Sequence, residues 1–304
     1  VMDQPNHRSL HAVPTPRIGG LGVLAGILGG AMALLTLRGE LPSPLWTLLL
    51  LLILLGGFCF VDDRRGLSAA LRLPVHLVIA AVWVACSGKV GAGDTASWPM
   101  LLGLALALGW MMNLYNFMDG SNGLAGGMAV FGFGAYGVAA WLAGQPELAA
   151  LAFVVAAAAL AFLIFNLDPA RVFLGDVGSI PLGFLAGALG LWGWQTTAWP
   201  AWFPLLVFSP FIVDATVTLL RRGLRGEKVW QAHHDHAYQR LVRSGWSHRR
   251  LAWAAYLLMA ACALSALVLR FSDKHWVMAS LALWGLLYAV ILLVVEYRWR
   301  QAQK

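Results

Sequence analysis

Long apolar runs separated by short polar joints constrain this chain more than any other feature. Hydrophobic residues make up 60% of its 304 residues and charged residues only 12%, whereas a soluble domain carries about 25% charged residues. The runs are continuous and lack the alternating ten-residue pattern of a membrane β-barrel. They predict an all-α fold, a polytopic membrane helical bundle that forms a single domain over residues 1–304.

About ten runs are candidates for transmembrane helices. Several are shorter than the roughly 20 residues that cross a bilayer upright, so we expect their ends to extend into flanking polar residues. The predicted spans are Ile18–Leu37, Leu45–Phe60, Leu73–Cys86, Met100–Phe117, Gly123–Leu142, Leu148–Phe165, Ser179–Trp194, Trp202–Leu220, Arg250–Leu269 and His275–Val295.

The loops between these spans alternate between two faces that differ in charge. One face collects both chain ends and the long loop 221–249, and it carries 17 of the 21 Lys and Arg residues. Cytoplasmic loops of membrane proteins are enriched in Lys and Arg. We therefore expect this face to be cytoplasmic.

A polar, glycine-broken joint lies on that face between the fourth and fifth predicted spans. It places Asn113, Asn116, Asp119 and Asn122 within ten residues of one another. A polar group at membrane depth costs several kcal/mol unless protein or water satisfies it. Such a concentration of amides and carboxylates at a membrane boundary indicates a functional site.

Two further acidic motifs fall on the same face. Asp62 and Asp63 follow the second span directly and precede Arg64 and Arg65; they form either a metal-proximal acid–base pair or an ordinary polar helix end. Asp176 lies in a glycine-rich turn before the seventh span, where it could be a metal ligand or a helix N-cap.

The long loop 221–249 carries a third motif, made of His233, His234, His236 and Arg240. Zinc is an alternative ligand for the histidines, but no remote cluster supplies the further ligands of a structural zinc site. A basic surface facing anionic lipid is the simplest interpretation of the arginines in this loop. Donors beside carboxylates are also suited to a phosphorylated substrate with a divalent metal.

Asp214 lies inside the eighth predicted span. An ionisable residue within a span is by default a functional hypothesis, and packing against a polar group of a neighbouring helix is the equal alternative. Taken together, the loops of the cytoplasmic face predict one pocket with carboxylates for magnesium and basic groups for phosphates, which is a typical arrangement for phosphoryl-type transfer.

These motifs, in this order, resemble those of the polyprenyl-phosphate N-acetylhexosamine-phosphate transferases, glycosyltransferase family 4. The resemblance extends from residue 3 to about residue 250, and the His-His-Asp-His form is most similar to the bacterial branch that initiates O-antigen and related surface glycans. The motifs are Asp3-x-Pro-Asn-x-Arg-x-x-His11, Pro14-Thr-Pro-Arg-x-Gly-Gly20, Asp62-Asp63, Asn113-x-x-Asn116-Phe-Met-Asp119-Gly-x-Asn122-Gly, Phe173-Leu-Gly-Asp176-x-Gly-Ser and His233-His-Asp-His236-x-Tyr-Gln-Arg.

The resemblance implies a reaction in a bacterial inner (cytoplasmic) membrane, with the active site on the cytoplasmic face. Undecaprenyl phosphate attacks the β-phosphorus of a UDP-N-acetylhexosamine, giving the lipid-diphosphate sugar and UMP. The implied cofactor is Mg²⁺, with Mn²⁺ as an alternative ion. The bilayer is the further partner; we expect no nucleic acid, and the small-residue spans allow a homodimer.

The resemblance also implies residue roles. Asp62, Asp63 and Asp176 are the catalytic set, with Asp62 the candidate base. Asp176, Asp119 and Asn122 are the candidate metal ligands. The candidate substrate-binding residues are Asn113, Asn116, Asp119, Asn122, His233, His234, His236 and Arg240.

Two departures from the family pattern matter. Many relatives carry a second Asp where Asn122 stands, although an amide oxygen still suits a hard cation. Relatives also have a helix before the Asp-x-Pro motif, so we expect an eleventh helix to precede this chain. Direct attack by the lipid phosphate needs only positioning and charge stabilisation, and we favour it over a covalent intermediate on Asp62 or Asp63.

Alternative functions remain open. A muramyl-pentapeptide phosphotransferase would use the same motifs on a different sugar, and the sequence does not identify the N-acetylhexosamine. An ion-coupled transporter would use broken helices and the intramembrane Asp214, but its site would lie near mid-membrane. An intramembrane aspartyl protease would need two facing Asp residues within spans and has no use for the His-rich loop.

Overall fold

The computed structural model describes residues 2–3, 14–39, 43–87, 97–228 and 233–304. Its helices are α1 (Gly19–Arg38), α2 (Ser43–Arg65), α3 (Ala69–Cys86), α4 (Trp98–Phe117), α5 (Leu124–Leu142), α6 (Pro146–Asn166), α7 (Asp176–Gln195), α8 (Trp202–Val207), α9 (Ser209–Leu224), α10 (Ala237–Arg243), α11 (His248–Leu269) and α12 (Lys274–Ala302). The short strands β1 (Met2–Asp3) and β2 (Thr15–Pro16) pair in antiparallel fashion.

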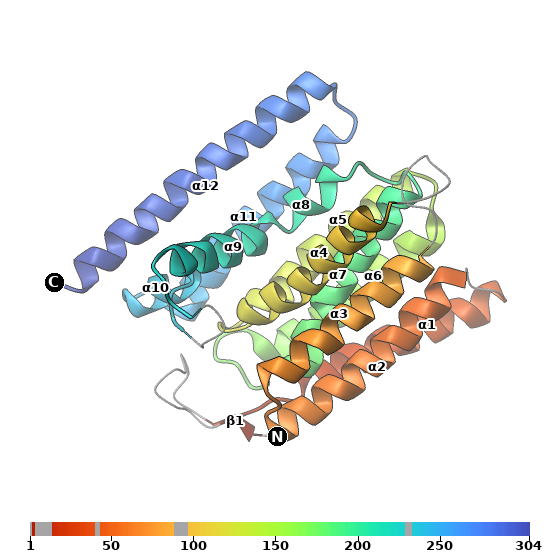
Figure 1. Cartoon of the computed structure of the whole chain (residues 1–304), viewed down its shortest axis with the longest axis horizontal. Helices are drawn as coiled ribbons and strands as arrows, with labels where there is room; N and C mark the ends of the chain where they lie inside the picture. Colours follow the sequence, from red (N-terminus) through yellow and green to blue (C-terminus); the bar gives the residue numbers. More distant parts are fainter. Residues whose placement is uncertain (1, 4–13, 40–42, 88–96, 229–232) are drawn as a thin grey trace.

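The predicted all-α membrane bundle is confirmed. Nine helices of the described part are long and apolar enough to cross a membrane, which is every helix except α8, α9 and α10. The long helices run side by side along one axis, while β1, α10 and the two chain ends lie at one end of the bundle (Figure 1). We call this end the site face.

Helix α7 forms the centre of the bundle. Almost all of its residues are buried, and it packs against α2, α4, α1 and α5. Close contact with α4 depends on Gly183, where a Cβ atom would lie 2.7 Å from the Met111 carbonyl oxygen. Small residues at helix interfaces allow this approach in lipid, where apolar burial alone does not drive helices together.

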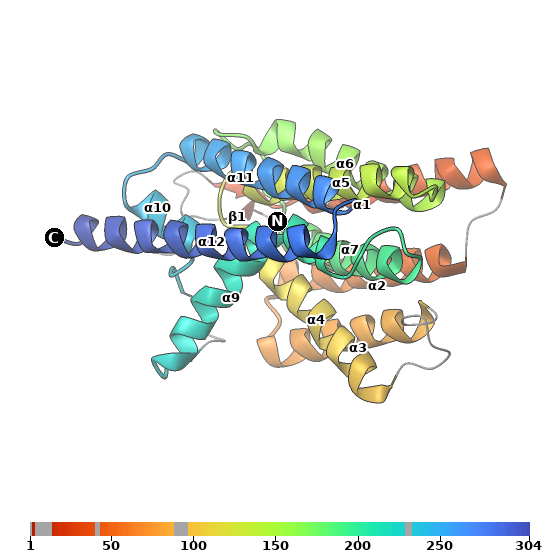
Figure 2. The ribbon, with the colours of Figure 1, turned by 90° about the horizontal axis from the view of Figure 1, so that it is seen from above.

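The eighth predicted span, Trp202–Leu220, is wrong as a single helix. The chain forms the six-residue α8 and then α9, with the break between Val207 and Ser209. Pro210 has no backbone N–H and follows the break, so the helical hydrogen-bond ladder is interrupted there. Helix α9 leaves the bundle at a steep angle (Figure 2).

The break between α8 and α9 does not change which end of the bundle the chain reaches. Thr196, before α8, donates a hydrogen bond to Gln145 at the α5–α6 connection, which lies at the end opposite to the site face. Asp214 of α9 contacts Ala237, where α10 begins at the site face. Together α8 and α9 therefore carry the chain from one end of the bundle to the other, as a single eighth span would.

Two predicted boundaries also shift. Asp62 and Asp63 belong to the last turn of α2, which continues to Arg65, rather than to a loop after it. The predicted loop 221–249 contains the end of α9, all of α10 and the start of α11. The leader residues from 4 to 13, which include Asn6, Arg8 and His11, lie outside the described residues.

Candidate functional site

The ends of three helices bring the acidic motifs together at the site face. Asp62 and Asp63 lie in the last turn of α2, Asn116 in the last turn of α4, and Asp176 is the first residue of α7. Asp119 is the second residue after the end of α4. These five residues form what we call the carboxylate cluster.

Asp63 binds the N-terminus of α7 rather than standing free. Its carboxylate oxygens accept hydrogen bonds from the backbone N–H groups of Asp176, at 3.2 Å, and Val177, at 3.1 Å. The first N–H groups of a helix have no partner within the helix and carry partial positive charge. An acidic side chain from α2 therefore supplies the N-cap that the sequence of α7 lacks.

Gly175 makes this arrangement possible. Its φ of +72° lies in the left-handed region, and a Cβ atom at this position would lie 2.9 Å from Oδ2 of Asp63. Glycine is the residue that adopts such a conformation without strain and leaves room for the carboxylate.

Asn116 holds the side chain of Asp176. Its amide nitrogen donates to Oδ1 of Asp176 at 2.8 Å and to Oγ of Ser179 at 3.0 Å. Asn113 lies one turn earlier on α4, and its amide donates to the Gly109 carbonyl oxygen of its own helix at 2.7 Å. Asn116 is thus the amide of this helix that orients the acidic cluster.

Arg72, which the sequence did not single out, lies between two carboxylates. Its Nη1 atom is 3.5 Å from Oδ2 of Asp62 and 3.4 Å from Oδ2 of Asp176. Arg72 stands in the first turn of α3, and the short α2–α3 connection returns it to the end of α2. A basic residue just after the short connection that follows Asp62-Asp63 was the signal in the sequence.

One oxygen of Asp62 is held by a hydrogen bond, and the other faces the guanidinium group of Arg72. Oδ1 accepts the backbone N–H of Leu67 at 2.7 Å. Oδ2 is buried and accepts no hydrogen bond within the described part of the chain, and the residue as a whole is only 4% exposed. Its contact with Arg72 is an ion pair at 3.5 Å rather than a close hydrogen bond, so this oxygen has capacity for a further partner.

Asp119 lies within electrostatic reach of the other acids. Burial raises the pKa of its carboxyl group, the negative charge of Asp176 raises it further, the nearby Arg17 opposes the shift, and Asp63 adds to it. Repulsion between neighbouring carboxylates is relieved when a cation binds. The predicted position of Asp119 beside Asp176 therefore has a physical basis.

Asn122, the third predicted metal ligand, faces a different segment. Its amide nitrogen donates to Oδ1 of Asp168 at 3.0 Å in the α6–α7 connection, and no hydrogen bond joins it to Asp119 or Asp176 among the described residues. The same connection is fixed to the start of α1, because the backbone N–H groups of Gly19 and Gly20 donate hydrogen bonds to the carbonyl oxygens of Phe173 and Leu174.

Asp214 has a structural partner in α10. Its carboxylate accepts the backbone N–H groups of Ala237 at 2.8 Å and Tyr238 at 3.2 Å, and the hydroxyl of Thr218 at 3.2 Å. The position of Asp214 favours the packing alternative. The residue caps the short helix that follows the histidine motif.

The histidine motif is held by ion pairs and stacked rings. Asp235 pairs with Arg222 and Arg240, and Arg240 also pairs with Glu296 of α12. The predicted substrate-binding residue Arg240 is therefore buried between two acids. His233 and His236 have ring centroids 4.8 Å apart.

The histidine motif adjoins the carboxylate cluster through the end of α4. The ring of Phe117 stacks on His236 with centroids 6.1 Å apart, and the Phe117 carbonyl oxygen accepts the Tyr238 hydroxyl at 3.0 Å. Asp119 lies two residues beyond Phe117. His234 belongs to the same segment as His236. The structure therefore places the histidine motif and the carboxylate cluster on either side of the α4–α5 joint.

The donor set suits a hard divalent ion. The described residues contain no group of three or more His, Cys, Asp or Glu side chains arranged to hold a metal on their own. Mg²⁺ usually retains water and takes one or two carboxylates plus substrate phosphates. Asp176, Asp119 and Asp62 are the carboxylates near enough to one another to contribute to such an incomplete site.

These observations define the class of protein. It is a multi-pass membrane enzyme whose helical bundle carries an acidic cluster and a histidine motif at one end. Residues 45–193 match the model of glycosyl transferase family 4. The chain belongs to this family, because one matching relative is 30% identical over most of both chains.

Three relatives illustrate the match. A probable undecaprenyl-phosphate N-acetylglucosaminyl 1-phosphate transferase of Bacillus subtilis is 30% identical, over 97% of this chain and 82% of the relative. The undecaprenyl-phosphate alpha-N-acetylglucosaminyl 1-phosphate transferase of Yersinia pestis is 28% identical, over 100% of this chain and 86% of its own. A phospho-N-acetylmuramoyl-pentapeptide-transferase of Geobacillus kaustophilus is 30% identical, over 81% and 82%.

Proposed function

We propose that this protein transfers an N-acetylhexosamine-1-phosphate group from a UDP-sugar to undecaprenyl phosphate, releases UMP, and depends on Mg²⁺. The reaction would take place on the cytoplasmic side of a bacterial inner membrane and would initiate a lipid-linked surface polysaccharide such as O-antigen. The observation that carries the proposal is the meeting of Asp62, Asp63, Asp119 and Asp176, from separate elements, beside the histidine motif.

The side chains suggest how the reactants are positioned. Asp63 fixes the start of α7, Asn116 orients Asp176, and Arg72 bridges Asp62 and Asp176. A bound Mg²⁺ would be held by Asp176 and Asp119 and would neutralise charge on the phosphates. Oδ2 of Asp62, which is held only by the ion pair with Arg72, would accept a proton from the acceptor phosphate in its proposed role as base.

Bond changes in this proposal follow direct displacement. An oxygen of the lipid phosphate forms a bond to the β-phosphorus of the UDP-sugar, the bond from that phosphorus to the bridging oxygen breaks, and UMP departs with the electron pair. Asp63 is a poor candidate for a covalent nucleophile, because both of its oxygens accept backbone hydrogen bonds.

Release of UMP tests the proposal. Purified protein with undecaprenyl phosphate, UDP-N-acetylglucosamine and Mg²⁺ should release UMP, EDTA should stop the release, and Asp176→Asn should abolish it. Asp273→Asn is the matched control, because Asp273 is an exposed acid at the start of α12, away from the site face. Undiminished release in Asp176→Asn would overturn the role given to this carboxylate.

Two variations separate the competing mechanisms and substrates. Labelled UMP that exchanges into the UDP-sugar without any lipid would favour a covalent intermediate over direct attack. A second candidate function is phospho-N-acetylmuramoyl-pentapeptide transfer, which the printed name of the Geobacillus kaustophilus relative supports. A panel that includes UDP-N-acetylmuramoyl-pentapeptide distinguishes the two, since UMP release only with that donor would favour the second function.

A further inference from the structure

Helix α12 stands apart from the rest of the bundle. Among its 29 residues only Val277, Tyr288 and Val295 are buried, and its principal packing is with the short α10 rather than with its neighbour α11. Figure 1 shows α12 and α11 as separate rods that α10 joins near the site face. A helix at the edge of a bundle usually packs more closely against its neighbours than α12 does.

A cavity of about 350 Å³ lies between α9, α11 and α12. Its walls are almost entirely apolar and include Pro210, Phe211, Leu258, Met259, Ile291 and Val294. The polar groups within it are already engaged: Asp214 caps α10, and the Tyr288 hydroxyl lies 2.6 Å from Oγ of Ser209. Ligand-binding pockets commonly have volumes of about 300–1,000 Å³. Between membrane-spanning helices, the surrounding solvent is hydrocarbon.

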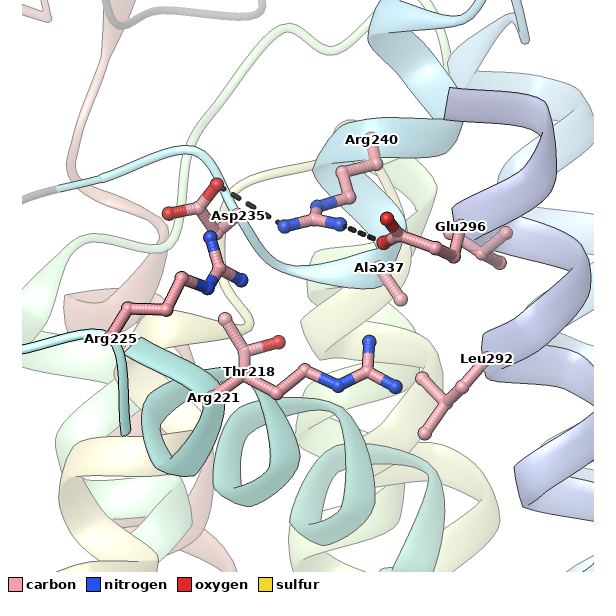
Figure 3. Close-up of a pocket in the computed structure, with 9 residues that line it drawn as sticks. Thr218, Arg221, Arg225, Asp235, Ala237, Arg240, Leu292 and Glu296 are labelled. Carbon is pink, nitrogen blue, oxygen red and sulfur yellow. Dashed lines mark hydrogen bonds and ion pairs between the residues drawn. The ribbon is translucent and has the colours of Figure 1, made fainter. Parts of the chain in front are cut away.

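The end of this cavity at the site face is cationic. The mouth, where α9, α10 and α12 meet, is lined by residues that include Arg221, Arg225, Arg240, Asp235 and Glu296 (Figure 3). Ala237, Leu292 and Val295 line both the mouth and the cavity, so the two adjoin. An apolar chamber that opens onto positive charge is complementary to a molecule with a hydrocarbon tail and an anionic head.

One arginine of the mouth has no counter-charge in contact with it. Arg240 is paired with Asp235 and Glu296, and Arg225 is paired with Glu227. Arg221 makes no hydrogen bond or ion pair with any described residue, and it extends from α9 towards Leu292 of α12 (Figure 3). Arg298, which also lines the cavity, lies over the ring of Trp246 at 5.8 Å.

We propose that an anionic phospholipid of the bilayer occupies this site, with one acyl chain in the cavity between α9, α11 and α12 and its phosphate at Arg221. The lipid would fill the space that keeps α12 away from the bundle and would place a phosphate in contact with Arg221, which Glu296 reaches only at longer range. The cavity also reaches Met118 and Leu124, which flank the α4–α5 joint, so the test compares the phospholipid with undecaprenyl phosphate directly. The inference is independent of the proposed reaction.

Lipid retention measures this binding without donor or acceptor. The purified protein in detergent is titrated with phosphatidylglycerol or with phosphatidylcholine, which has no net charge, and bound lipid is counted by native mass spectrometry. We expect phosphatidylglycerol to bind at least tenfold more tightly. Arg221→Gln should remove most of this preference, whereas Arg249→Gln, at an exposed arginine on the same face outside the site, should retain it.

A second pair of variants tests the chain-binding cavity. Ala254 of α11 lines the cavity, so Ala254→Phe should reduce binding of both lipids about tenfold. Ala261→Phe places the same ring at an exposed position of α11 outside the cavity and should bind normally. Thermal unfolding of all four variants confirms that the fold is retained.

Four outcomes would overturn the proposal. Equal retention of the two phospholipids, or normal binding by both Arg221→Gln and Ala254→Phe, would show that no such site exists. Stoichiometric displacement of phosphatidylglycerol by undecaprenyl phosphate at a much lower concentration would assign the cavity to the acceptor. Conversion of a dimer to a monomer by Ala254→Phe, without a change in lipid binding, would assign it to a second copy of the chain.

Discussion

The carboxylate of Asp63 caps the helix whose first residue is Asp176, although the two residues are 113 positions apart in the sequence. Two acids of the cluster therefore differ in what they do. Asp63 uses its charge to hold a helix N-terminus, where a negative side chain is favourable. Asp176 is left with its carboxylate directed towards Asn116 and Arg72.

The first prediction concerns the cap itself. Asp63→Ala should lower the free energy of unfolding by about 0.5–2 kcal/mol, which is the range for loss of an N-cap, and should reduce activity because α7 carries Asp176. Asp63→Asn keeps one acceptor oxygen and should lie between the wild type and the alanine variant. The measurements are the thermal midpoint in detergent and UMP release. A more stable Asp63→Asn would show that repulsion from Asp176 outweighs the cap.

The second prediction concerns the amide that orients Asp176. Asn116→Ala removes the hydrogen bond to Oδ1, so we expect kcat to fall about 10–100-fold, as is usual when the partner of a functional carboxylate is lost. Ser179→Ala is the comparison. The Ser179 hydroxyl accepts a hydrogen bond from the same Asn116 amide, but it donates to the Gly175 carbonyl oxygen rather than to the Asp176 carboxylate. Equal losses in the two variants would contradict an orienting role for Asn116.

The third prediction separates a structural Asp214 from an ion-coupling one. Asp214→Ala leaves two buried backbone N–H groups without an acceptor, each of which costs about 1–3 kcal/mol. Stability and activity should fall together. Asp214→Asn retains an acceptor oxygen and should recover much of both, whereas a residue that works through its charge would fail equally as Asn or Ala. The thermal midpoint and UMP release of the two variants decide between these outcomes.

The sequence predicted much of this arrangement and missed the contacts that depend on helix packing. Counting spans and positive charges placed Asp62, Asp63, Asp119 and Asp176 on one face, because each span reverses the chain. The cap from Asp63 to α7 was not predictable, since it requires the ends of α2 and α7 to meet. Arg72 was missed for a similar reason, because it approaches Asp176 only after α3 folds back on α2.

The break in the eighth span was missed because apolar residues continue through it. Phe208, Ser209 and Pro210 interrupt the helix, yet hydropathy averaged over the run Trp202–Leu220 still indicates one span. In the sequence, the ionisable Asp214 indicated that this segment differs from a simple transmembrane helix. Its partners, the N–H groups of Ala237 and Tyr238, lie 23 and 24 positions away in the sequence, beyond the reach of any local pattern.

The fourth prediction is a dependence of stability on pH. The pKa of His233 is lowered from 6.5 to about 4, chiefly by burial; the neighbouring His236 and Arg222 contribute to this shift and Asp235 opposes it. Between these two pH values the unfolded chain binds more protons at this position than the folded protein. Stability is therefore fully present above pH 6.5 and is lost as the pH falls towards 4.

Thermal midpoints between pH 4 and pH 8 measure this effect. His233→Gln should flatten the decrease between pH 6.5 and pH 4, because glutamine does not titrate. His275→Gln is the control, since His275 is an exposed residue of α12 at the opposite end of the bundle, and it should leave the decrease unchanged. An identical pH profile for the wild type and His233→Gln would exclude a buried neutral histidine at this position.

The fifth prediction isolates the contact between Gly175 and Asp63. Gly175 and Gly226 have nearly the same φ, +72° and +73°, but a Cβ atom on Gly226 would meet no atom within 4 Å, whereas one on Gly175 would lie 2.9 Å from Oδ2 of Asp63. Gly226→Ala should cost only the backbone strain of about 1–2 kcal/mol. Gly175→Ala should cost more, because it also displaces the Asp63 carboxylate from the start of α7, and it should reduce UMP release while Gly226→Ala retains it. In the background of Asp63→Ala the two glycine substitutions should have the same effect on the thermal midpoint, and a persistent difference there would mean that Gly175 acts through some other neighbour.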